Sequence, residues 1–83
     1  MTPETKDFID NLNCFQAKAG CIYSQNQAII YWRRIKPYLT EDQERDLKIA
    51  WNHHRYIGEG RQELDEVCNK IINKLNEEII GTG

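Results

Sequence analysis

The clearest structural signal in this sequence lies in residues 40–58, which read TEDQERDLKIAWNHHRYIG. Thr40 and Gln43 have the spacing of a capping box, in which each side chain satisfies a free backbone N–H at the start of a helix. The acidic residues directly after Thr40 suit the positive end of a helix dipole, and Gly58 suits a helix end. The sequence therefore predicts a helix over residues 41–57. Its apolar stripe consists of Leu47, Ala50, Trp51 and His54.

Another helix is predicted near the N-terminus, over residues 3–19. Thr2 suits the N-cap, and Pro3 suits the first helical position, where its missing N–H has no intrahelical partner in any case. Gly20 is placed to end this helix in the left-handed conformation. Apolar residues recur at steps of three and four, which places them on one face; they are Phe8, Ile9, Leu12, Phe15 and Ala19.

Residues 24–36 are predicted to form the helix between these two. Ser24 and Gln27 have capping-box spacing, which favours a helix start at Ser24. Pro37 cannot continue the hydrogen-bond ladder and disfavours a helical residue before it, so regular helix should stop or kink near Ile35. The apolar stripe consists of Ala28, Tyr31, Trp32, Ile35 and Leu39.

The last predicted helix spans residues 61–80 and is followed by a flexible tail over residues 81–83. Its apolar residues alternate steps of four and three, as in a short bundle helix. This stripe is wide enough to be shared with a second copy, so a homodimer through this helix is one expected assembly. The stripe consists of Leu64, Cys68, Ile71 and Leu75, widened by Val67, Ile72 and Ile79.

The whole pattern indicates one all-α domain over residues 1–83, a small bundle of three to four helices. No stretch alternates apolar and polar residues over five positions, so no sheet is expected. The chain of 83 residues is long enough for one domain and too short for two. Short links between the helices favour an antiparallel bundle or an irregular orthogonal one.

Composition restricts the classes of function and the compartment. The formal net charge of −2 disfavours both a basic nucleic-acid coat protein and an acidic DNA mimic. Three cysteines without paired spacing do not form a disulfide framework, and the N-terminus resembles no secretory signal. No apolar run approaches the ~20 residues that a membrane-spanning helix needs. A cytoplasmic protein without a membrane contact is therefore expected.

The only basic stretch of the chain is interleaved with aromatic residues. Between Gly20 and Glu41 there are two arginines, one lysine and no acid. Aromatic and arginine side chains are typical of protein-binding hot spots, while basic residues with stacking rings can also bind nucleic acid. The plainest interpretation is a solvated helix face. The candidate partner-binding residues are Tyr31, Arg33, Arg34, Lys36, Tyr38 and Arg55.

Histidine and cysteine residues are the only candidates for metal binding or nucleophilic catalysis. Their spacing lacks the local pairs typical of structural zinc sites, and nothing in the sequence places a thiol beside an imidazole and an orienting group. The glycines at 58 and 60 lack the pattern of a phosphate-binding loop. We therefore expect no metal, no cofactor and no enzyme. The weak metal candidates are Cys14, Cys21, His53, His54 and Cys68.

These observations favour a small non-enzymatic helical module that binds a larger protein and regulates or inhibits it. The small size, the Asn-, Ile- and Lys-rich composition and the lack of a motif suit a protein encoded by a phage or mobile element. Two alternatives stay open at this point. One is nucleic-acid binding through the basic segment 33–36, and the other is a helical domain stabilised by zinc.

Overall fold

A computed structural model describes residues 2–58 and 61–82, and within these ranges all side chains except those of residues 57 and 78–82. The described part is helical throughout and contains no strand, which confirms the predicted all-α bundle. Its elements in chain order are α1 (Pro3–Ala19), the 3-10 turn η1 (Ile22–Ser24), α2 (Gln25–Ile35), the 3-10 turn η2 (Lys36–Tyr38), α3 (Glu41–Ile57) and α4 (Arg61–Thr82).

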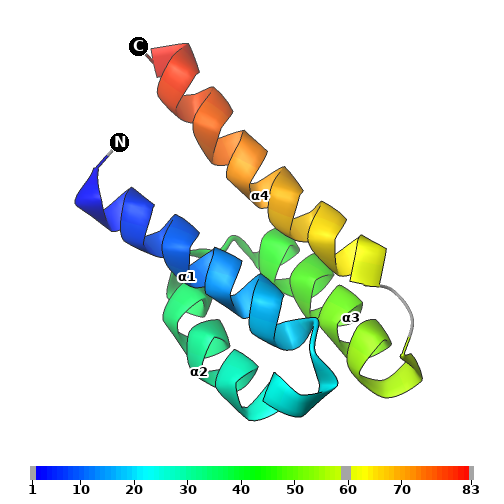
Figure 1. Cartoon of the computed structure of the whole chain (residues 1–83). Helices are drawn as coiled ribbons and strands as arrows, with labels where there is room; N and C mark the ends of the chain where they lie inside the picture. The colour runs from blue at the N-terminus through cyan, green and yellow to red at the C-terminus, as the bar shows by residue number, and fades with distance from the viewer. Residues whose placement is uncertain (1, 59–60, 83) are drawn as a thin grey trace.

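The helices are arranged so that α1 lies between α2 and α4 and contacts both (Figure 1). α3 and α4 run antiparallel as a hairpin, and the most extensive contacts join α1 with α2 and α3 with α4. The principal extents are 42 × 20 × 19 Å, because a helix of 22 residues is about 33 Å long and α4 projects beyond the rest. Of the helices that follow one another in sequence, α1 packs extensively on α2 and α3 on α4, and α1 also contacts α4, which is distant in sequence.

The core forms where the predicted stripes of the four helices meet. Phe15 lies at its centre, fully buried, in an edge-to-face contact with Trp51 whose ring centroid is 5.1 Å away. Trp32 completes this aromatic cluster at 5.6 Å from both rings. In the stripe of α4, Leu64, Cys68 and Ile71 are buried within the bundle, and Leu75 is half-buried. The homodimer expected through this helix stays a prediction. The other fully buried core residues are Leu12, Ala19, Ala28, Ile35, Leu47, Ala50, Leu64 and Cys68.

Several helix ends agree with the sequence prediction. Both hydrogen bonds of the capping box between Thr40 and Gln43 are present at the start of α3. Thr2 caps α1 by accepting a hydrogen bond from the Thr5 backbone N–H at 3.1 Å. Gly58 ends α3 with φ +80°, a left-handed conformation that side chains with a Cβ adopt only with strain. Regular α-helix stops at Ile35, as Pro37 requires.

Two predicted capping interactions are wrong, although α1 ends at Ala19 and Ser24 is the N-cap residue of α2, as expected. Gly20 follows α1 with φ −76°, so it is not left-handed. Ser24 makes no capping bond to α2; its hydroxyl instead donates to the carbonyl of Lys18 at 2.9 Å. In both cases the expected cap is replaced by hydrogen bonds that close the end of α1. Ser24 bonds to Lys18, and the Gly20 carbonyl bonds to side chains of α3 and α4.

The remaining boundaries differ only slightly from those expected. α2 begins one residue later than predicted, at Gln25, and residue 36 belongs to η2. α4 continues to Thr82, two residues beyond the predicted end, so it includes residues 81 and 82 of the expected tail; residue 83 lies outside the described residues. None of the described helices combines the length and apolar character that crossing a membrane would need.

Candidate functional site

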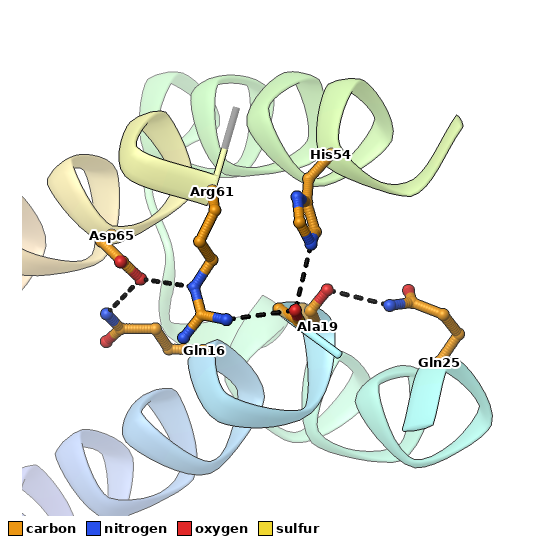
Figure 2. Close-up of polar contacts among 7 residues, drawn as sticks. Gln16, Ala19, Gln25, His54, Arg61 and Asp65 are labelled. Atoms are coloured by element: carbon orange, nitrogen blue, oxygen red, sulfur yellow. Dashed lines mark hydrogen bonds and ion pairs between the residues drawn. The ribbon is translucent and has the colours of Figure 1, made fainter. Parts of the chain in front are cut away.

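A cluster of polar side chains closes the C-terminal end of α1 (Figure 2). The carbonyl oxygen of Gly20 accepts hydrogen bonds from His54 Nε2 and Arg61 Nη1, both at 3.1 Å. These donors come from α3 and α4, which are 34 and 41 residues further along the chain. A helix C-terminus leaves its last carbonyls unsatisfied and carries partial negative charge, so polar and cationic side chains stabilise it.

Gln25 connects this cluster to the aromatic core. Its Nε2 donates to the carbonyl oxygens of Ala19 and Cys21 at 2.8 and 2.9 Å, and its Oε1 accepts from Trp51 Nε1 at 2.8 Å. One amide therefore joins the end of α1, the start of α2 and the middle of α3. Nothing in the sequence distinguishes Gln25 from its neighbours, since Trp51 lies 26 residues away.

Asp65 provides the acidic member of the cluster. Its Oδ1 accepts from Gln16 Nε2 at 2.7 Å and from Arg61 Nε at 3.1 Å. Burial alone raises the pKa of Asp65, but the hydrogen bonds from Gln16 and Arg61 outweigh burial and lower this pKa below its usual value. The carboxylate thus orients Arg61 toward the carbonyl of Gly20.

Gly20 is required by this close approach rather than by its backbone angle. A Cβ added at Gly20 would overlap the guanidinium of Arg61. The cluster therefore explains the glycine whose predicted left-handed role was wrong. Its polar groups bond to one another at the half-buried junction of α1, α3 and α4, although His54 Nδ1 is buried there without a hydrogen-bond partner among the described residues. Contacts that join three helices in this way indicate a structural role.

The histidine and cysteine candidates do not come together. His53 Nδ1 contacts Glu63 Oε2 at 3.0 Å, whereas His54 contacts Gly20. Among the described residues, no group of three or more potential metal-ligating side chains could hold an ion. The expectations of no metal and no cofactor stay predictions.

The three thiols lie in contrasting surroundings. Cys68 is buried, and its burial raises the pKa of the thiol to about 12. Cys21 is exposed, and hydrogen bonds from the Ser24 side chain and the Tyr23 backbone lower the pKa of its thiol. Cys14 is exposed on α1. Thiol reactivity should therefore differ sharply between buried and exposed positions.

The predicted partner-binding residues are divided between two ends of the bundle. Arg34, whose Cζ lies 5.3 Å from the ring centroid of Tyr31, and Tyr38 lie at the C-terminal end of α2 and in η2. Arg55 lies near the opposite end of α2, with its Cζ 5.4 Å from the ring centroid of Trp51 and 5.2 Å from that of Tyr56. Arg33 is exposed, and Lys36 pairs with Glu44 at 3.6 Å.

Two of these residues line a surface hollow of about 350 Å³ between α1 and η2, here called the α1–η2 hollow. Phe8 and Tyr38 provide its aromatic wall, with ring centroids 6.0 Å apart and a tilt of 50°. Tyr38 is 69% exposed, although it is a large aromatic side chain. The sequence did not predict the contribution of α1. The residues that line the hollow are Glu4, Asp7, Phe8, Asn11, Arg34 and Tyr38.

Opposite charges face this hollow without pairing. Glu4 and Asp7 belong to α1 and Arg34 belongs to α2, yet none of the ion pairs among the described residues involves any of the three. The hollow therefore combines an open aromatic surface with charged groups that are free to bind a partner.

A larger surface groove of about 850 Å³ runs between the start of α3 and the second half of α4. Val67 and Ile71 contribute apolar surface, and Lys70 and Lys74 lie among acidic residues along its edges.

Comparison with known protein families, curated proteins and solved structures finds no match to the chain.

Proposed function

We propose that this chain is a non-enzymatic protein-binding module that docks on a larger protein through the α1–η2 hollow and thereby regulates or inhibits it. The observation that carries the proposal is the exposed ring of Tyr38, which lines the hollow together with the unpaired Arg34. Tyrosine and arginine are enriched at the centres of protein interfaces, where a few side chains provide most of the binding free energy.

The form of the hollow supports a protein partner. Its volume of about 350 Å³ lies at the low end of the range for small-molecule sites and suits one inserted side chain. The ring of Tyr38 has only two side-chain torsions, so binding orders it at low entropic cost. Its contact with Phe8, which is 8% exposed, connects the docking surface to the hydrophobic core and keeps it in position.

Site-specific photocrosslinking tests this proposal. A benzophenone amino acid placed at position 38 should crosslink a partner in cells that produce the protein, whereas the same probe at the exposed position 48 of α3 should not. The substitution Arg34→Gln should change the yield of the crosslink from position 38, because Arg34 lines the same hollow. Equal crosslinking from both positions, or a crosslink that does not depend on Arg34, would contradict the proposal.

The alternative of nucleic-acid binding is favoured by the exposure of Arg33 and Arg34 in the last turn of α2. Acidic residues of α1 line the hollow beside Arg34, and Glu44 neutralises Lys36, which weakens attraction for phosphate. Titration of DNA and RNA oligonucleotides at several salt concentrations separates the two functions. Binding that falls steeply with salt would support the alternative, and no binding at low salt would exclude it.

A further inference from the structure

We infer that the α1–η2 hollow accepts an arginine side chain of the protein partner, with Glu4 and Asp7 as its carboxylate ligands and Tyr38 as its stacking surface. This inference rests on the proposed protein-binding function and specifies the chemistry that the partner must present. It follows from the charge, the aromatic wall and the size of the hollow.

The acidic wall of the hollow is available to a partner. Glu4 and Asp7 are exposed near the start of α1, and neither takes part in an ion pair among the described residues. Within the described part of the chain, Asp7 accepts one long side-chain hydrogen bond, from Asn11 Nδ2 at 3.4 Å. With Arg34 on the opposite wall, the hollow carries a formal charge of −2 + 1 = −1, which favours a cationic group.

The aromatic wall favours a guanidinium over a compact ammonium. A planar guanidinium stacks on an aromatic ring and donates two parallel hydrogen bonds to a carboxylate, which lysine cannot reproduce. The chain already places two of its own guanidinium groups over tyrosine rings, with Arg34 Cζ 5.3 Å from the ring centroid of Tyr31 and Arg55 Cζ 5.2 Å from that of Tyr56. Tyr38 offers an exposed ring beside Phe8 without such a cation over it among the described residues.

Arg34 sets a limit on the charge that the hollow accepts. Its guanidinium shares the hollow with the incoming one, and like charges repel across a partly solvated space. Removing this charge should therefore strengthen the binding of an isolated arginine group, while removing the carboxylates should weaken it. Opposite effects from the two walls of one hollow distinguish this geometry from general attraction to an acidic surface.

The test is an amide-detected NMR titration of the purified chain with N-acetyl-arginine amide, and with N-acetyl-lysine amide for comparison. Saturable shifts should appear around Phe8 and Tyr38, and the arginine probe should bind more tightly than the lysine probe. The double substitution Glu4→Gln with Asp7→Asn should weaken arginine binding by about tenfold, and Arg34→Gln should strengthen it about two- to threefold.

The matched control is Asp10→Asn, which removes an exposed charge of α1 outside the hollow and should leave binding unchanged. Circular dichroism of each variant verifies that the fold is retained. Shifts that are absent, that lie elsewhere, or that persist in the double variant would overturn the inference. If photocrosslinking from position 38 succeeds while the arginine probe fails, the protein-binding function stands and this inference does not.

Discussion

At Gly20 the absence of a side chain makes room for the guanidinium of Arg61. Gly20→Ala should displace Arg61 from its hydrogen bonds and lower the free energy of unfolding by about 1 kcal/mol. In an Arg61→Ala background the same change should raise stability by about 0.4–1 kcal/mol, because alanine restricts the unfolded chain and the backbone angle suits it. Urea unfolding of the four proteins measures both effects, and equal costs in the two backgrounds would contradict this explanation.

Asp65 should make stability depend on pH. Its pKa is lowered in the folded state, so its ionised form stabilises the fold at pH values above the unfolded pKa of about 3.9, and this contribution is lost as pH falls through the folded pKa. Asp65→Asn should therefore cost up to about 1 kcal/mol at neutral pH, since the side chain is partly exposed. Unfolding curves of the two proteins should converge in acid, and a constant difference across pH would contradict the assignment.

The sequence pattern identified two of the six residues that line the α1–η2 hollow. Arg34 and Tyr38 stand out in the sequence because basic and aromatic residues alternate there. Glu4 and Asp7 look like ordinary acids at a helix start, and Phe8 looks like one member of an apolar stripe. Their contribution depends on how α1 packs against α2, and local sequence does not encode that arrangement.

Between elements, the amide of Gln25 joins three helices through a single side chain. Gln25→Ala should lower the free energy of unfolding by about 1–3 kcal/mol, because it leaves the Trp51 N–H and the carbonyl of Ala19 without partners. The exposed Gln27 on the same helix is the matched control, and its replacement by alanine should have little effect. Thermal unfolding followed by tryptophan fluorescence measures both, and similar costs at the two positions would contradict the prediction.

The helices themselves could be predicted because their signals are local. The start of α3 depends on Thr40 and Gln43, and its end on Gly58, all within one segment. α2 begins directly after Ser24, but the predicted capping bond is absent because the hydroxyl of Ser24 donates to the carbonyl of Lys18 instead. A helix cap can thus be predicted from sequence when its hydrogen bonds stay within the same helix. It is predicted less well when the capping side chain bonds to a neighbouring helix instead.

At the scale of the whole molecule, the reactivity of the buried Cys68 thiol should report global unfolding. Its buried thiol, with a pKa raised to about 12, should react with a thiol reagent only when the bundle unfolds, whereas Cys14 and Cys21 should react at once. In a Cys14→Ser, Cys21→Ser variant, the labelling rate at neutral pH should rise with urea in parallel with the unfolding equilibrium. Fast labelling without denaturant would show that α4 separates from the bundle independently.

The two donors that meet at the carbonyl of Gly20 also constrain the order of events during synthesis. They lie 34 and 41 residues downstream, so α1 cannot complete its closing contacts until His54 and Arg61 have both left the ribosome. Until then, α1 lacks the side chains that close its C-terminal end, and Phe15 is not yet covered by Trp51 of α3. α1 therefore depends on α3 and α4 for the side chains that close its C-terminal end.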